Sequence, residues 1–304
     1  MRDTTLTPRG ERPSLAGVRV PSPSPPPSRA TAPQVRQTAA FEARPVKDEY
    51  TALCERVHAL SGVDLLQYKR QQMERRIRTW AQRRGTPDLG AYAGRMAADA
   101  TELEAFLDRV TINVSELWRH PEQFTAVGRE ILPELASQGP VRMWSAGCSY
   151  GAEAYTLAAI ARATVPRADV QIKGTDLDRR MVARAREGIF SAADVRLAPR
   201  DMIARHFEGR PDGGWAAKAD IKRLTSFEVG DLLRMPIRQA AHELVFCRNT
   251  VIYFNQEARD ALHERLVRSM RVGGYLVVGT SERVSNARAL GLSSPFPFIY
   301  RKTS

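Results

Sequence analysis

The chain has 304 residues, of which 43% are hydrophobic and 26% are charged. These values are ordinary for a globular protein of one large domain or two smaller ones, so the composition excludes a wholly disordered chain. The formal net charge of +12 favours an acidic partner, but nucleic acid, anionic lipid and an acidic protein surface all fit that description.

Hydrophobic segments and cysteines indicate the cellular compartment of the protein. No apolar run approaches the roughly 18 residues of a membrane span, and no charged-then-apolar segment opens the chain, so we expect neither membrane insertion nor a secretory signal. Three cysteines lie far apart, without a CxxC pair or a histidine at ligand spacing: Cys54, Cys148 and Cys247. We therefore expect no disulfide framework, no metal site, and reduced thiols in a cytoplasmic protein.

The first 45 residues differ in composition from the rest. Residues 1–45 hold nine of the 19 prolines, with serines between them and almost no large apolar side chain. Because proline removes backbone donors and this stretch has little to bury, we predict a disordered tail that acts as a spacer. A ligand for a proline-reading module is the less favoured alternative.

Helical periodicity follows over residues 46–110, which predicts a small bundle in a domain of residues 46–115. A first helix ends at Gly62, a second runs from Gln67 to Arg84, and two more cover 88–97 and 101–110. Residues 69–84 contain seven basic side chains against Glu74. This pattern fits a solvated helix face or a docking face for an acidic helix equally well.

After Pro140 the pattern changes to alternating strands and helices, which predicts a doubly wound, largely parallel sheet in a domain of residues 116–304. Residues 207–230 interrupt the alternation with Gly209, Pro211 and two further glycines. We expect a small inserted β-subdomain at about 190–230. The remaining elements expected are strands at 141–145, 169–175, 244–247, 274–279 and 298–301, and helices at 153–164 and 179–187.

A glycine-containing turn follows the first strand, at residues 146–151, and Asp176 ends the second strand. Such a turn places backbone amides at the ligand crevice, and a carboxylate at the position of Asp176 can accept both ribose hydroxyls. The dinucleotide pattern GxGxxG and the Walker A loop are both missing. An adenosyl ligand without a pyrophosphate, with S-adenosylmethionine (SAM) as the best candidate, therefore fits better than NAD or ATP.

Four ordered stretches resemble the CheR family of chemotaxis-receptor protein-glutamate O-methyltransferases, over roughly residues 46–302. They are Thr111-Ile-Asn-Val-Ser-Glu-Leu-Trp-Arg119, Val141–Thr156, Phe246-Cys-Arg-Asn-Thr-Val-Ile-Tyr-Phe254, and Gly273-Gly-Tyr-Leu with Gly279-Thr-Ser-Glu282. The resemblance implies a Rossmann-like SAM-dependent methyltransferase sheet, an N-terminal helical domain and a small inserted β-subdomain. It also implies a monomeric cytoplasmic enzyme that methylates glutamate γ-carboxyls of chemoreceptors, with SAM and no metal.

The resemblance also implies roles for individual residues. Asn113, Ser115 and Arg119 belong to a segment that closes over the cofactor, and Tyr253 lies near the methyl group. Arg119 is the candidate for orienting the substrate carboxylate. The remaining cofactor-binding residues implied are Gly147, Glu153, Asp176 for the ribose, Asp231 and Leu232 beside the adenine, and Arg248 and Asn249.

The arginine-rich helix then becomes a candidate for docking on the cytoplasmic helical domain of a receptor, through Arg75, Arg76 and Arg83. Aromatic residues do not interleave with these arginines outside the buried stripe, so we expect no nucleic-acid partner. The alternatives are a methyltransferase acting on RNA or on another protein, and a SAM-binding regulatory module without catalysis.

Overall fold

A computed structural model gives the fold of residues 48–110 and 115–304. The tail predicted at 1–45 and the candidate residue Asn113 lie outside these described residues. Within the described part of the chain, no helix is long and apolar enough to cross a membrane.

The predicted helical bundle occupies residues 48–110, with a core of apolar side chains at helical spacing. Gly62 ends the first helix with φ 77°, a left-handed conformation that favours glycine. The second helix begins later than expected, because Leu65–Gln67 form a separate 3-10 turn capped by the carboxylate of Asp64. The helices are α1 (Glu49–Ser61), α2 (Arg70–Arg83), α3 (Leu89–Ala98) and α4 (Ala100–Val110).

The large sheet confirms the predicted α/β methyltransferase fold. Within residues 115–304 its seven strands have the order β6-β2-β1-β7-β8-β10-β9. The pairs from β6 to β8 are parallel, whereas β10 is antiparallel to both β8 and β9. The strands are β1 (Val141–Ala146), β2 (Val170–Asp176), β6 (Thr225–Val229), β7 (His242–Cys247), β8 (Met270–Val278), β9 (Leu292–Phe296) and β10 (Ile299–Lys302).

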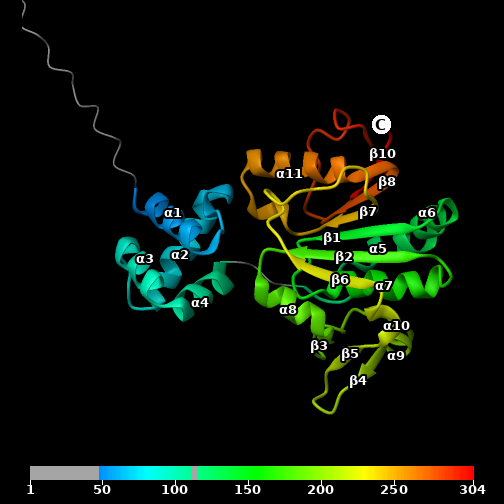
Figure 1. Cartoon of the computed structure of the whole chain (residues 1–304), viewed down its shortest axis with the longest axis horizontal. Helices are drawn as coiled ribbons and strands as arrows, with labels where there is room; N and C mark the ends of the chain where they lie inside the picture. The colour runs from blue at the N-terminus through cyan, green and yellow to red at the C-terminus, as the bar shows by residue number, and fades with distance from the viewer. Residues whose placement is uncertain (1–47, 111–114) are drawn as a thin grey trace, which may run out of the picture. The chain divides into compact units, whose positions relative to one another are not determined.

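Helices cover both faces of this sheet (Figure 1). Alternate side chains of one strand point to opposite faces, so Met143 packs in one core with α7, while its neighbour Trp144 packs in another with α11. The strand order reverses between β1 and β7, which opens a crevice at their carboxyl ends, where α/β proteins bind ligands. The helices are α5 (Pro121–Ala126), α6 (Leu132–Gln138), α7 (Ala152–Thr164), α8 (Arg179–Glu187) and α11 (Gln256–Ser269); α5 and α6 are joined by a π-helical turn, Val127–Ile131.

The small antiparallel sheet predicted as an insertion is present, but its extent differs from expectation. Its strands have the order β3-β5-β4 and lie between α8 and β6. The prediction of an insertion over 190–230 included residues 225–229, which is wrong for that strand: β6 pairs in parallel with β2 in the large sheet. The elements of the insertion are β3 (Ile189–Phe190), α9 (Arg200–His206), β4 (Phe207–Gly209), β5 (Trp215–Ala217) and α10 (Ala219–Lys222).

A short antiparallel bridge joins the bundle to the sheet domain, and both belong to one compact unit, Lys47–Ser304. Tyr68 pairs with Phe254. The backbone N–H of Lys69 donates to the carbonyl of Tyr253 at 2.9 Å, and the N–H of Asn255 donates to the carbonyl of Gln67 at 2.8 Å. These bonds explain why Tyr68 is extended instead of helical.

Candidate active site

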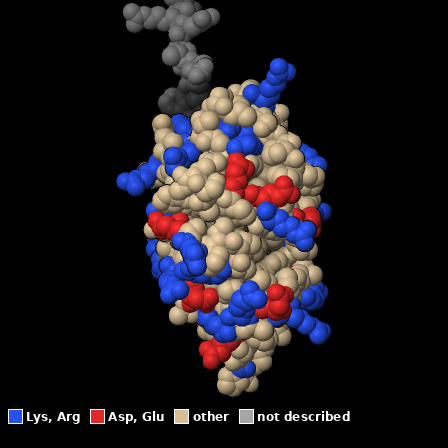
Figure 2. Space-filling view, turned by 90° about the vertical axis from the view of Figure 1, so that its right-hand side faces the viewer, with Lys and Arg blue, Asp and Glu red and all other residues tan. Residues whose placement is uncertain are grey.

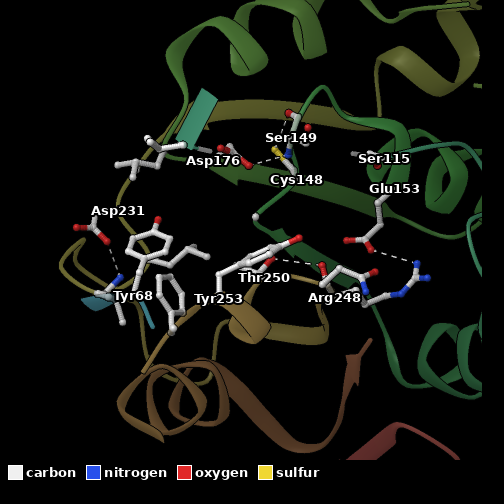
Figure 3. A pocket seen from close by; sticks show the side chains of 18 of the residues that line it. Tyr68, Ser115, Cys148, Ser149, Glu153, Asp176, Asp231, Arg248, Thr250 and Tyr253 are labelled. Carbon is white, nitrogen blue, oxygen red and sulfur yellow. Dashed lines mark hydrogen bonds and ion pairs between the residues drawn. The ribbon is translucent and has the colours of Figure 1, made fainter. Parts of the chain in front are cut away.

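One cavity lies at the carboxyl ends of the parallel strands and brings together the predicted catalytic and cofactor-binding residues that the structure describes. Figure 3 shows Tyr253 near its middle, with Asp231 and Tyr68 on one side and the pair formed by Glu153 and Arg248 on the other. The predicted residues that line the cavity are Ser115, Arg119, Gly147, Glu153, Asp176, Asp231, Leu232, Arg248, Asn249 and Tyr253.

The glycine turn after β1 holds Asp176 in place. Gly147 has φ 81°, and its N–H donates to the carbonyl of Thr175 at 2.8 Å. A Cβ at Gly147 would collide with the hydroxyl of Thr250, so the turn has no room for a side chain. Ser149 N–H donates to Asp176 Oδ2 at 2.7 Å, and burial raises the pKa of Asp176 above its usual 3.8.

Glu153 and Arg248 form a buried pair at the other end of the cavity. Arg248 Nη1 donates to Glu153 Oε2 at 3.3 Å, and the hydroxyl of Ser145 donates to Oε1 at 2.7 Å. Arg248 also donates to the carbonyl of Arg119. Burial outweighs the pairing on both sides, because it raises the pKa of Glu153 and lowers the pKa of Arg248.

Asp231 lies near the bundle, at the end of the cavity opposite to Arg248. Its Oδ1 accepts the N–H of Leu233 at 2.9 Å, and its Oδ2 lies 3.8 Å from Arg234 Nε. Arg234 Nη2 in turn donates to Asp64 of the bundle at 2.6 Å. The loop that carries Asp231 and Leu232 is therefore tied to the helical domain.

Tyr68 is a cavity residue that the sequence analysis missed. Its ring packs edge-on against Phe254 with ring centroids 5.0 Å apart. Burial, together with the nearby charges of Asp176 and Asp231, raises the pKa of Tyr68, so its hydroxyl remains a donor. The missing signal was the break between Gln67 and Arg70, which a helical pattern alone does not reveal.

Tyr253 and Arg119 lie near each other in the cavity. Burial raises the pKa of Tyr253, while the positive charges of Arg76 and Arg119 oppose that shift. A second hollow, the basic groove, adjoins the cavity and shares Arg76 and Tyr253 with it. The basic groove is lined by Tyr68, Lys69, Gln72, Met73, Arg75, Arg76, Thr79, Arg109 and Tyr253.

The predicted docking residues do not lie together. Arg75 is exposed and Arg76 half-buried, and both line the basic groove, whereas Arg83 is exposed outside it. The guanidinium of Arg76 donates to the carbonyl of Val110 at 3.0 Å.

The residues present fit an adenosyl group with an amino-acid tail. Asp176 can accept the ribose hydroxyls, and Leu177, Leu232 and Phe254 offer apolar contact to a base. The Nε of Arg248 is buried and has no hydrogen-bond partner among the described residues, so it can bind a carboxylate. Within 48–110 and 115–304, no group of three or more His, Cys, Asp or Glu side chains is placed to hold a metal ion.

Comparisons with known proteins agree with this arrangement. Residues 48–111 match the family model "CheR methyltransferase, all-alpha domain", and residues 113–294 match "CheR methyltransferase, SAM binding domain". A chemotaxis protein methyltransferase of Listeria monocytogenes is 31% identical over 244 residues, covering 80% of this chain and 92% of the relative. Chemotaxis protein methyltransferase 1 of Pseudomonas aeruginosa is 30% identical over 237 residues, covering 74% and 86%. The chain therefore belongs to the CheR family and is a SAM-dependent methyltransferase of the chemotaxis type.

Proposed function

We propose that the protein is a protein-glutamate O-methyltransferase, which converts glutamate side chains in the cytoplasmic helical domain of chemoreceptors into methyl esters. The connection between the two hollows carries this proposal: the cavity and the basic groove share Tyr68, Met73, Arg76 and Tyr253. An acidic segment bound in the groove can therefore present a carboxylate at Tyr253. The names of the relatives, chemotaxis protein methyltransferases, favour a receptor as the source of that segment.

The proposed mechanism needs positioning more than proton transfer. When bound, SAM supplies an electrophilic methyl group, whose transfer to a carboxylate yields a methyl ester and S-adenosylhomocysteine. An ionised glutamate carries no proton to remove, so no general base is needed. Arg119 would pair with the substrate carboxylate through its planar guanidinium, and Tyr253 would border the transferred methyl group. Holding the reactants in line can supply about 7–11 kcal/mol of the barrier reduction.

Asp176, Asp231 and Leu232 would hold the adenosine, and Glu153 and Arg248 the amino-acid tail. Gly147, Ser115 and Asn249 complete the wall of the same cavity. Asn113 is proposed to join them from outside the described residues.

Charge on helix α2 supports receptor docking through the basic groove. Arginines in this helix and directly after it are held in ion pairs within the bundle: Arg70 with Asp48 and Glu74, Arg78 with Glu74, and Arg84 with Glu102. The basic groove is lined instead by Arg75 of α2, by Lys69 just before that helix and by Arg109 of α4. The face in Figure 2 has Lys and Arg interspersed with Asp and Glu, so this one face lacks the continuous basic surface that nucleic-acid binding favours.

A methyl-transfer assay tests the function. Labelled SAM is incubated with the cytoplasmic fragments of chemoreceptors from the same genome, and separately with RNA. We expect label in the receptor that mild base releases as methanol, since carboxyl esters hydrolyse readily, and no label after the modified glutamates are changed to alanine. Transfer to RNA, or binding of S-adenosylhomocysteine without transfer to any receptor, would contradict the proposal.

Charge reversal tests the docking surface. Arg75→Glu should raise KM for the receptor by about tenfold, because it places a like charge in the path of an acidic segment. Arg83→Glu on the same helix is the matched control and should have a smaller effect, because Arg83 does not line the groove. Calorimetry with S-adenosylhomocysteine should give unchanged affinity for both variants. An unchanged KM for Arg75→Glu would refute docking in the groove.

A further inference from the structure

Glu282 is a buried carboxylate beside the cavity that the proposed mechanism does not use. It lies in the turn after β8 and is 3% exposed. Glu282 does not line the cavity, so it does not face the cofactor or the substrate directly.

The carboxylate of Glu282 accepts backbone N–H groups from the loop after β7 and from its own turn. Its Oε2 accepts the N–H of Asn249 at 2.8 Å, and its Oε1 accepts the N–H of Ile252 at 3.3 Å. The N–H of Gly279 also donates to Oε2, at 2.6 Å. A buried backbone N–H without a partner is costly, so these bonds fix the position of the loop that carries Asn249 and Ile252.

The local backbone is built around this contact. Asn249 has φ 56°, a left-handed conformation that is uncommon for a residue other than glycine. A Cβ at Gly279 would lie 2.6 Å from Glu282 Oε2 and 2.9 Å from Asn249 N, so this close approach requires glycine. The Glu282 carboxylate therefore binds the backbone of Asn249 in its left-handed conformation, and a side chain at position 279 would collide with this contact.

The loop held in this way carries much of the candidate site. Arg248, Asn249, Thr250 and Tyr253 all lie on it and line the cavity. Arg248 then reaches Glu153 and the carbonyl of Arg119, so a shift of the loop would move both ends of that network.

We infer that Glu282 is a positioning residue for cofactor binding: it fixes the backbone from Arg248 to Tyr253 so that these side chains meet the cofactor. This inference rests on SAM binding and does not require the receptor to be the substrate.

A second buried carboxylate offers a matched control. Glu243 lies at the amino end of strand β7, whereas the Glu282-bound loop follows its carboxyl end. Glu243 is 8% exposed, and it accepts the N–H of Arg142 at 2.6 Å and Arg271 Nη1 at 2.8 Å. It thus resembles Glu282 in burial and in binding a backbone N–H, but it is distant in the fold from the cavity end of the strand.

The experiment compares Glu282→Gln with Glu243→Gln in the full-length protein. The new amide NH₂ of Glu282→Gln faces backbone donors, so we expect the affinity for S-adenosylhomocysteine, measured by calorimetry, to fall about tenfold. Both variants should lower Tm to a similar degree, but Glu243→Gln should leave the affinity for S-adenosylhomocysteine unchanged. Wild-type affinity in Glu282→Gln, or an equal loss in Glu243→Gln, would overturn the positioning role.

Glu282→Asp covers the case in which the glutamine variant does not fold. It keeps the charge but withdraws the carboxylate by one methylene, so a folded protein with reduced affinity supports the inference and one with wild-type affinity refutes it. This experiment measures cofactor binding alone. If the receptor proves not to be the substrate, the methyl-transfer assay shows that failure, and the affinities measured here still test the role of Glu282.

Discussion

Two buried glutamates show how the bundle and the candidate site differ. Glu102 in the bundle accepts the hydroxyl of Tyr92 at 2.7 Å, Arg95 Nη2 at 2.9 Å and Arg84 Nε at 3.0 Å, and these partners lower its pKa to about 2. Glu153 in the cavity has one arginine at 3.3 Å and the hydroxyl of Ser145, and burial raises its pKa.

This is the difference expected between a carboxylate that stabilises the fold and one that, as proposed above for Glu153, binds a ligand. Partners from α3 and from Arg84, the residue after α2, surround Glu102, so its charge is compensated within the chain. Around Glu153 the compensation is incomplete, and Arg248 beside it keeps a buried Nε without a partner among the described residues. A bound group with its own charges would complete that end of the cavity, which is how perturbed pKa values mark functional sites.

Removing the bundle carboxylate should have the largest effect. Glu102→Ala leaves the hydroxyl of Tyr92 and the partly exposed guanidinium groups of Arg84 and Arg95 without their shared acceptor, so we expect the free energy of unfolding to fall by about 3 kcal/mol. Urea unfolding measures this loss, and Glu104→Ala on the same helix, at an exposed position, should cost little. A loss below that of the Glu104 control would show that the network does not stabilise the bundle.

The same carboxylate should make the stability of the protein depend on pH in the acid range. The pKa of Glu102 falls from 4.5 in the unfolded chain to about 2 in the folded protein, so unfolding takes up a proton between these values. Its contribution is present above pH 4.5 and is lost as the pH falls toward 2, by roughly 3 kcal/mol at 1.36 kcal/mol per unit. Stability measured at about pH 5 and about pH 3 should therefore decrease more steeply in wild type than in Glu102→Gln; equal slopes would contradict the assignment.

Asp176, which lines the same cavity as Glu153, tests whether carboxylates there bind a ligand as proposed. Asp176→Ala should reduce the affinity for S-adenosylhomocysteine about 100-fold, because hydrogen bonds to a charged group are worth about 1.5–3 kcal/mol each. The control is Asp169→Ala, at the residue before the amino end of β2. It removes only an exposed ion pair with Arg142, so this variant should bind S-adenosylhomocysteine normally. Calorimetry decides, and undiminished binding by Asp176→Ala would reject the ribose assignment.

Tyr68 should give the smallest effect, because it supplies one wall of the cavity. Tyr68→Leu is expected to weaken binding of S-adenosylhomocysteine about fivefold through lost aromatic contact and a lost hydroxyl donor. Tyr68→Phe separates these two causes by removing the hydroxyl alone. Tyr50→Phe in the same bundle is the control, since its hydroxyl donates to the carbonyl of Leu65 and does not line the cavity. Normal affinity in Tyr68→Leu would remove Tyr68 from the site.

The sequence predicted those parts of the fold that short-range patterns determine. The turn at Gly147, the helix from Glu153 and the acidic end of β2 at Asp176 follow from local glycine chemistry and from buried strand residues. Their meeting at one sheet edge follows from parallel topology. The other site residues, such as Arg119, Arg248 and Tyr253, could be named only from the resemblance to the CheR family.

The remaining features depend on pairing between distant segments. Residues 225–229 look like part of an insertion until their parallel register with β2 is known. Tyr68 looks helical until its bridge with Phe254 is seen, and nothing in the sequence shows that Glu282 binds the N–H groups of Asn249 and Ile252. Local propensity carries no information about such partners.

The bridge between Gln67–Lys69 and Tyr253–Asn255 limits how this enzyme can be recombined with its relatives. In a chimera with its crossover in the connection after α4, the main-chain bonds beside the site would have to form between a bundle and a Tyr253 segment of different origin. The segments on both sides of the bridge therefore form one discontinuous module, and exchanging them together keeps the bonded pair intact.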